Sequence, residues 1–414
     1  MVSRDSPEEE ALREEVRAFL DENLPDKWGT PEYEPPEQDS LEERTQNKTF
    51  TRKLYDSGYA GFGVPGEYGG VERPAQERNI IREELRRRGT PPLAGGLGNL
   101  VVNTLLQWGT EEQKKYYIPR ILDGTDQWIE GFSEPNAGSD LANVQTTAVR
   151  DGDEWVVNGQ KCWTSGWRRG DWCFLLCRTD VNAPRHRNLS YFLFDCNTPG
   201  FSRGPLRQMT GDSLFGELFF DDMRIPHENM VGEEGRGWYV AMTTLIAERG
   251  GGQVDAATGE SGVRGTVIRT IGGSSARFGT INLLIEMAMN HKHYGKSAWS
   301  NPSYRHRIAQ LAMEGEAMRA YSVRLSSIIR SGKASGNEAV MQKMMRTERD
   351  KRHADLMMEI HGAYSQLVKG DPRAVEDGLY SINMLRTRGS TISAGSSEIC
   401  RNILSERILG LPRE

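Results

Sequence analysis

Residues 130–166 read EGFSEPNAGSDLANVQTTAVRDGDEWVVNGQKCWTSG, and this stretch is the most informative part of the sequence about fold and function. It begins with a polar, glycine-bearing loop over 133–140, which offers hydroxyl groups and free backbone N–H groups. It ends on Trp163-Thr164-Ser165, a large aromatic ring followed by two hydroxyls. A flat heterocycle with apolar faces and a polar edge would suit this pair of features. The alternative is a β-rich domain that carries a chance turn sequence.

The length and composition of the chain exclude several classes of protein. Its 414 residues are too many for one ordinary core and indicate two or three domains. The net charge of −6 comes from well-mixed side chains, which argues against nucleic-acid binding. No apolar run is long enough to span a membrane and the polar start MVSRDSPEEE is no secretory signal, so a cytoplasmic protein is expected. The five cysteines show no CxxC pattern and the seven histidines no zinc spacing, so no metal is expected.

The periodicity of apolar residues divides the chain into three parts. Residues 1–126 carry helical patterns and are predicted to form an N-terminal all-α domain. Residues 127–233 change to short alternating segments, which predict a middle β domain. Residues 234–414 return to helical patterns and are predicted to form a C-terminal all-α domain.

Glycine marks the places where the chain is expected to turn. Asp151-Gly152 and Asn158-Gly159 are both typical of two-residue hairpin connections, so we expect a turn at each. A series of glycines over 250–278 predicts a long loop or a poorly ordered insertion after the first helix of the C-terminal part.

The stretch 130–166 resembles the flavin-binding middle domain of the acyl-CoA dehydrogenases. That family has the same Phe-Ser/Thr-Glu-Pro-x-Ala-Gly-Ser-Asp loop and Lys-x-Trp-x-Thr/Ser strand, an ordered match far more specific than a lone GxGxxG. The resemblance covers almost the whole chain. It implies an α+β multi-domain fold with an N-terminal helical domain, a middle β-barrel or sandwich and a C-terminal four-helix bundle. It also implies FAD as the cofactor and an acyl-CoA as the substrate.

The resemblance implies a chemistry as well as a fold. A base takes the α proton of an acyl-CoA thioester while the β hydrogen leaves as hydride to the flavin N5, which gives the α,β-unsaturated product. Hydrogen-bond donors must hold the thioester carbonyl, because they stabilise the enolate-like charge as it develops.

The resemblance assigns the flavin contacts to both ends of the stretch. Ser133 would hydrogen-bond the pyrimidine edge, Ser165 would sit near N5, and Trp163 would cover the isoalloxazine ring. The alternative for Trp163 is a plain core aromatic, which the following Thr164 and Ser165 disfavour. The implied cofactor-binding residues are Glu130, Phe132, Ser133, Gly138, Ser139, Trp163, Thr164, Ser165, Ser396 and Glu398.

The catalytic base is where this sequence departs from many family members. In those members a glutamate directly precedes a Gly-Thr/Ser-Ser segment near the C-terminus, and that position is here Ala394, which has no acid–base capability. In isovaleryl- and long-chain-type relatives the glutamate instead precedes an arginine on a helix after the β domain. Glu248, followed by Arg249, occupies that place and is the predicted base. The alternative is an ordinary solvated ion pair at a helix end.

Three positions are expected to bind the substrate: Ser139, Arg249 and Ala394. Ser139 matches a residue that also touches the CoA arm. The backbone N–H of residue 394 needs no side chain and could bind the thioester oxygen, and the small alanine leaves room for a carboxylate from the other wall.

The nucleotide contacts of the family are altered at two places. An arginine four before Gly295, which in the family meets the FAD of a neighbouring subunit, is here His291, and a glycine pair is reduced to His361-Gly362-Ala363. Some bacterial relatives that degrade steroid side chains form complexes of two different subunits sharing each flavin. This chain is therefore expected to form a homo-oligomer or a hetero-oligomer with a homologous subunit. Its expected electron acceptor is electron-transfer flavoprotein or a similar protein. A flavin-sharing subunit, or a flavin oxidase or hydroxylase on the same fold, are the alternatives.

Overall fold

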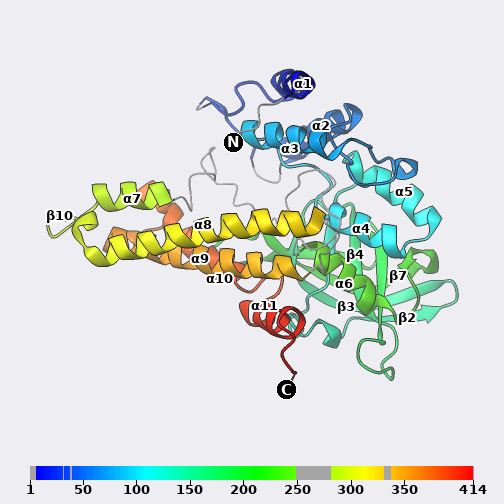
Figure 1. Ribbon diagram of the computed structural model, residues 1–414. Helices are drawn as coiled ribbons and strands as arrows, with labels where there is room; N and C mark the ends of the chain where they lie inside the picture. Colours follow the sequence, from blue (N-terminus) through cyan, green and yellow to red (C-terminus); the bar gives the residue numbers. More distant parts are fainter. Residues whose placement is uncertain (1–5, 31, 38–39, 249–280, 331–336, 414) are drawn as a thin grey trace. The chain divides into compact units, whose positions relative to one another are not determined.

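The computed structural model describes two compact units. The described residues are 6–30, 32–37, 40–248, 281–330 and 337–413. The first unit holds the described residues up to 248, except Met209–Gly211, which group with the second unit. The second unit is built from the helices that begin at residue 281 (Figure 1). The order of helices, sheet and helices that the sequence predicts is confirmed, whereas the domain boundaries after 126 and 233 stay a prediction.

In its described residues, the first unit begins with five α-helices, two of which start at capping boxes that are visible in the sequence. They are α1 (Pro7–Asn23), α2 (Leu41–Asp56), α3 (Ala75–Arg88), α4 (Gly98–Trp108) and α5 (Glu111–Leu122). Helix α5 begins with a capping box in which Thr110 and Gln113 exchange side-chain and backbone hydrogen bonds. Helix α1 begins in the same way at Ser6 and Glu9.

An eight-stranded sheet follows the helices in the same unit. Its strands are β1 (Trp128–Gly131), β2 (Thr147–Asp151), β3 (Glu154–Ser165), β4 (Trp172–Arg178), β5 (Leu189–Asp195), β6 (Phe201–Leu206), β7 (Phe215–Pro226) and β8 (Met230–Val231). The strand order is β6-β7-β3-β2-β4-β5-β8, and β1 pairs in parallel with β4. Strand β3 therefore lies inside the sheet, between β2 and β7, where neighbours on both sides hold its backbone.

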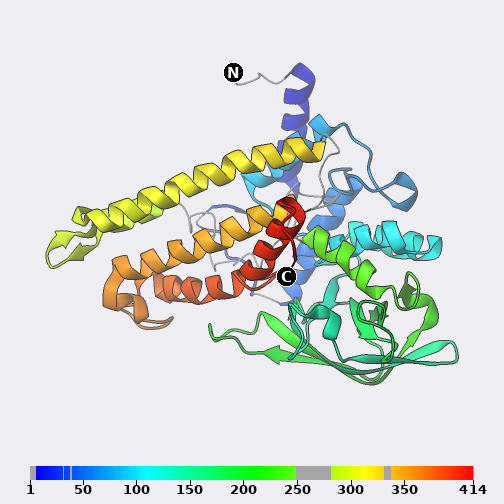
Figure 2. The same cartoon turned by 60° about the horizontal axis from the view of Figure 1, so that its bottom comes forward.

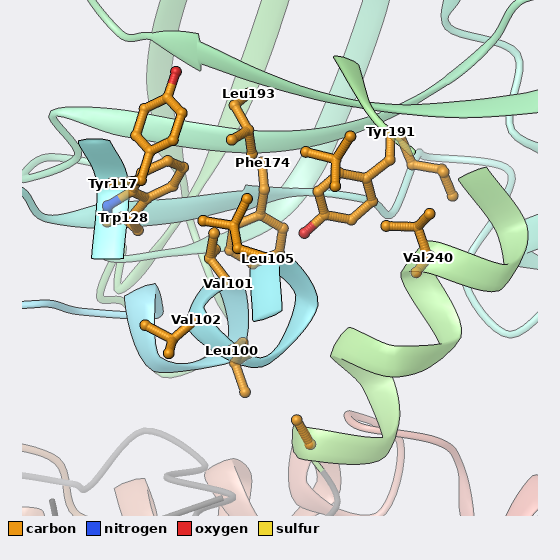
Figure 3. Packing of buried hydrophobic residues seen from close by; sticks show 14 of the residues in the cluster. Leu100, Val101, Val102, Leu105, Tyr117, Trp128, Phe174, Tyr191, Leu193 and Val240 are labelled. Atoms are coloured by element: carbon orange, nitrogen blue, oxygen red, sulfur yellow. The ribbon is translucent and has the colours of Figure 1, made fainter. Parts of the chain in front are cut away.

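Strand β4 separates two hydrophobic cores. Phe174 and Leu176 belong to one buried cluster, and Cys173, Leu175 and Cys177 belong to the other, so successive side chains face opposite sides. Figure 3 shows the first cluster, in which Val101 and Leu105 of α4 point toward aromatic side chains of the sheet. Burial on both faces explains why this strand reads as a continuous apolar run.

The two predicted hairpin turns have different outcomes. Asp151-Gly152 is confirmed, because β2 and β3 pair as an antiparallel hairpin around it. The prediction for Asn158-Gly159 is wrong, since both residues lie within β3. Gly159 has φ 148° and sits at a register shift between β3 and β7, which is a bulge. A Cβ at this position would lie 2.6 Å from Thr146 Oγ1, so close approach of the backbone explains the glycine.

Helix α6 (Gly237–Glu248) also belongs to the first unit. Thr244 on this helix bonds Thr104 of α4 at 2.8 Å between the hydroxyl oxygens. The indole N–H of Trp108 donates to Thr243 Oγ1 at 2.9 Å. These bonds fix α6 along α4 and hence against the sheet.

The second unit is a helical bundle with a short hairpin. It contains α7 (Ile281–Asn290), β9 (Lys292–His293), β10 (Lys296–Ser297), α8 (Pro302–Arg330), α9 (Glu338–His361), α10 (Leu379–Ser390) and α11 (Ser397–Ile403). Helices α8, α9 and α10 lie side by side, as Figure 2 shows. Their shared core includes Ile308 of α8, Leu356 of α9 and Tyr380 of α10. Within the described residues, no helix is long and apolar enough to cross a membrane.

We expect Gly159→Ala to lower the free energy of unfolding by about 3 kcal/mol, because it adds a clash to a backbone conformation that only glycine adopts readily. Gly152→Ala is the matched control. Its φ is also positive, at 63°, but a Cβ there meets nothing within 4 Å, so its cost should stay near 1 kcal/mol. Chemical denaturation followed by tryptophan fluorescence measures both, and equal losses would contradict the bulge assignment.

Candidate functional site

The loop that leaves β1 is tied to the far end of β3. The backbone N–H of Cys162 donates to the Ser133 carbonyl at 2.8 Å. The Thr164 hydroxyl donates to the Glu130 carbonyl at 2.9 Å. The structure thus joins the two ends of the stretch 130–166 into one surface, which we call the two-arm surface: its loop arm is 130–140 and its strand arm is 161–165.

A buried ion pair lies beneath this surface. The ammonium of Lys161, which has no solvent exposure, donates to Glu134 Oε1 at 2.8 Å and to the Phe132 carbonyl at 3.0 Å. The Glu134 carboxylate also accepts the backbone N–H groups of Gln145, at 2.6 Å, and Thr146, at 2.9 Å. Burial by itself raises the pKa of the Glu134 carboxyl, but Lys161 and the N–H donors hold that pKa below its ordinary value. The carboxylate is therefore ionised at neutral pH.

Sequence reasoning missed Glu134 and Lys161 as site residues, although both stand in the motif that carries the resemblance. One signal was available. Lys161 is a charged residue in a strand whose side chains are alternately buried and exposed. A lysine can be buried there only if another group accepts hydrogen bonds from its ammonium. The sequence does not say which of the many acidic side chains that acceptor is.

The indole of Trp163 is exposed on the two-arm surface. Its side chain has 56% relative exposure, while its neighbours Cys162 and Thr164 are buried. Its backbone has φ 64°, in the left-handed region that costs a non-glycine residue on the order of 1 kcal/mol. A register shift between Lys161 and Thr164 accompanies this conformation, and such bulges re-aim side chains. The plain core aromatic is therefore excluded as an account of Trp163.

Three serine hydroxyls on the two arms have no internal hydrogen-bond partner in the described part of the chain. Ser133 and Ser165 are half-buried and Ser139 is exposed, and none of the three hydroxyls has a hydrogen-bond partner among the described residues. A Cβ at Gly138 would meet nothing within 4 Å, so the loop is open there. An exposed aromatic plane with unused hydroxyls fits a flat heterocycle with a polar edge, which is the chemistry of a flavin.

Two of the expected contact residues have other tasks in the fold. The Phe132 side chain is 3% exposed and packs edge-on against Phe174, with ring centroids 5.5 Å apart. The Thr164 side chain is 1% exposed and its hydroxyl is used by the Glu130 carbonyl. The side chains of these two residues are therefore not available to a ligand.

The predicted base stands at the end of an anchored helix. Glu248 is the last residue of α6, whose hydrogen bonds to α4 are given above. Arg249 and the glycine-rich segment 250–278 lie outside the described residues. The role of Glu248 stays a prediction at this point.

The second unit presents a strained turn at the position where many relatives carry their base. Ala394 has φ 53° and Gly395 has φ 91°, so two successive residues are left-handed. The Lys343 ammonium donates to the Gly395 carbonyl at 2.7 Å. Ser396 caps α11 by accepting the N–H of Ile399 at 3.3 Å. The turn is therefore held by a lysine on one side and a helix cap on the other.

Glu398 is unsuited to act as a base. It lies in the first turn of α11 with 77% of its side chain exposed. Backbone hydrogen bonding at the helix start and the Ser396 hydroxyl hold its pKa below the ordinary value. A carboxylate that acts as a base near neutral pH needs a raised pKa, so the surroundings of Glu398 do not suit a catalytic role. They are compatible with the predicted contact to the cofactor.

The two altered nucleotide positions meet in the second unit. His361 is 6% exposed, its ring stacks on Tyr380 with centroids 4.8 Å apart, and the ring of His291 lies 4.7 Å away at 87°. Neither ring nitrogen of His361 has a hydrogen-bond partner in the described part of the chain. Burial and the nearby His291 lower the pKa of His361 to about 4.

Three family models match consecutive parts of the chain. They are the acyl-CoA dehydrogenase N-terminal domain over 6–125, the middle domain over 130–223 and the C-terminal domain over 264–409. The chain is 34% identical over 412 residues to the Mycobacterium tuberculosis protein named acyl-CoA dehydrogenase IpdE1. The matched region covers 98% of each chain.

Solved structures show the same similarity. The structure titled Tcur3481-Tcur3483 steroid ACAD matches with a TM-score of 0.73 and 29% identity over 100% of both chains. The ChsE4-ChsE5 complex from Mycobacterium tuberculosis matches with a TM-score of 0.72 and 28% identity, also over 100% of both chains.

We expect acid to destabilise the fold through His361 between pH 6.5 and 4. Because the folded pKa is about 4 and the ordinary value is 6.5, the unfolded chain takes up the proton first. This contribution is fully present above pH 6.5 and falls by up to about 3 kcal/mol as the pH drops to 4. His361→Asn should flatten that slope in denaturation curves recorded across this range.

The exposed His306 supplies the control. His306→Asn should leave the slope of the wild-type protein unchanged. A full slope in His361→Asn would mean that other groups cause the acid sensitivity.

Proposed function

The chain belongs to the acyl-CoA dehydrogenase family, and we propose that Glu248 is the base with which it desaturates an acyl-CoA thioester. Members of this family are FAD-dependent oxidoreductases, and FAD, when bound, accepts the β hydrogen of the substrate as hydride. The residues of the chain itself have three tasks. They hold the cofactor, take the α proton, and hold the thioester carbonyl.

The two-arm surface is the observation that supports this proposal most directly. It exposes the Trp163 ring at the cost of a left-handed backbone, and it leaves the hydroxyls of Ser133 and Ser165 unused by the fold. In the proposed complex, Trp163 would cover the flat ring system, the Ser133 hydroxyl would bond its polar pyrimidine edge, and Ser165 would lie near N5. Ser139, on the open part of the loop, meets the CoA arm of the substrate.

Glu248 is proposed as the base because its helix is hydrogen-bonded to α4 and because the alternative position carries no acid–base group. Thr243 accepts a hydrogen bond from Trp108, and Thr244 shares one with Thr104, so that α6 is anchored to α4 within the first unit. Ala394, at the position of the base in many relatives, carries only a methyl group. Its backbone N–H is proposed to hold the thioester oxygen, since a donor aimed at developing negative charge needs no side chain.

We also propose an oligomeric assembly in the cytoplasm, with an electron-transfer flavoprotein or a similar acceptor. Two similar solved structures are named for pairs of chains, Tcur3481-Tcur3483 and ChsE4-ChsE5. His291 and His361 stand where the family's nucleotide contacts are altered, and a homologous partner subunit could supply the missing arginine. The amount of FAD carried by the chain purified alone distinguishes a complete site from a shared one.

The substrate class is best tested by anaerobic titration with a panel of acyl-CoA esters, in which bleaching of the flavin band reports reduction. One similar structure is named a steroid ACAD, so steroid-derived acyl-CoA esters belong in the panel beside straight and branched chains. Bleaching by any member supports the proposed reaction. Rapid reaction of the reduced protein with oxygen, without bleaching by any ester, would favour an oxidase.

We expect Glu248→Gln to keep its yellow flavin and to lose turnover by at least about 10³-fold, because the amide cannot accept the α proton. The rate of flavin bleaching by the best ester of the panel measures the loss. Glu234→Gln, which alters an exposed glutamate near the start of the same helix, should bleach at the wild-type rate. Near-normal bleaching by Glu248→Gln would refute the assignment.

A further inference from the structure

We propose that Lys161 and Glu134 act as a positioning pair that sets the spacing between the two arms of the flavin site. They are not contact residues, since both lie beneath the surface: Lys161 is 0% and Glu134 is 8% exposed. The inference rests on the proposed flavin site and adds a task for residues that this site does not use.

The pair connects neighbouring residues of both arms. The Lys161 ammonium bonds the Phe132 carbonyl and the Glu134 carboxylate, which are the residues on either side of Ser133. The Ser133 carbonyl itself accepts the N–H of Cys162, the residue between Lys161 and Trp163. The place of the Ser133 hydroxyl relative to the Trp163 ring therefore depends on this network.

Glu134 also bonds residues that follow the loop arm. Its two carboxylate oxygens accept the N–H groups of Gln145 and Thr146, eleven and twelve residues further along. Its backbone exchanges hydrogen bonds with Ala137 at 2.9 and 3.1 Å. A single carboxylate thus holds the start and the end of the loop that carries Ser139.

Stability alone is a poor reason for this arrangement. Taking a lysine and a glutamate out of water costs free energy that their attraction only roughly offsets, and apolar residues of similar size often stabilise a core as well or better. What apolar residues cannot do is specify one spacing, because they lack directed hydrogen bonds. Besides their bond to each other, Lys161 and Glu134 make directed bonds to three backbone groups around the two-arm surface.

The test measures FAD binding rather than turnover. Lys161→Met keeps the length of the side chain and removes the ammonium, and Glu134→Gln keeps the shape and removes the charge. Each variant is freed of FAD and titrated with it, and the affinity and the visible spectrum of the bound flavin are recorded. We expect an affinity about tenfold weaker in both, as is typical when groups that orient direct ligands are lost, with a changed shape of the flavin band.

The control is a buried, ion-paired carboxylate of the same unit that belongs to neither arm. Glu84 of α3 is 2% exposed and bonds Arg13 and Arg17 of α1, each at 3.0 Å. Glu84→Gln should lower the thermal midpoint to a similar degree and leave FAD affinity and spectrum unchanged. An equal loss of FAD affinity in Glu84→Gln would mean that general destabilisation is the cause, and would overturn the proposal.

Trp163→Ala separates failure of this inference from failure of the flavin site. If Trp163→Ala loses FAD affinity while Lys161→Met and Glu134→Gln bind as the wild type does, the site stands and the positioning pair is refuted. If Trp163→Ala also binds FAD normally, the proposed flavin site itself is refuted. If both pair variants fail to fold while Glu84→Gln folds, the pair is a requirement for folding, and the positioning role is likewise overturned.

Discussion

A lysine ammonium placed where water cannot reach it is stable only beside fixed acceptors, and this constraint shapes the first unit. Lys161 projects from a strand inside the sheet, so its position is set by the pairing of β3 with β2 and β7. The loop after β1 must then come to it, with the Phe132 carbonyl and the Glu134 carboxylate as acceptors. A loop that would otherwise be free on the surface is thereby held against the strand.

The sheet can impose this geometry because both of its faces are covered. Residues of β4 alternate between two buried clusters, and helices α4 and α6 cover one of these faces (Figure 3). Hydrogen bonds from Thr104 and Trp108 to α6 add directed contacts to the apolar packing. A close-packed support of this kind is what allows neighbouring side chains to be held within a narrow range of positions.

Two of the residues expected to meet ligands have a strained backbone. Trp163 in the first unit and Ala394 in the second both have left-handed φ values that their side chains disfavour. Each is held by its surroundings, the first by a bulge in β3 and the second by Lys343 and the cap of α11. Strained residues persist where packing and hydrogen bonds over-determine them, which is common at functional sites.

Local signals in the sequence determined the order of elements, the capping box at Thr110, the turn at Asp151-Gly152 and the family of the protein. Each of these depends on residues a few positions apart, or on an ordered motif that can be read directly. The motif also contained Lys161 and Glu134, but their pairing could not be read from it, because the two are 27 positions apart.

Only the tertiary structure decided which of two similar glycine signals is a turn and which is a bulge. Gly152 has open space around it, whereas Gly159 lies against Thr146 of the neighbouring chain segment. Strand register likewise decided that Trp163 is exposed while Cys162 and Thr164 on either side of it are buried. The physical reason is the same in each case: contacts between distant segments depend on strand pairing and register, which no short stretch of sequence specifies by itself.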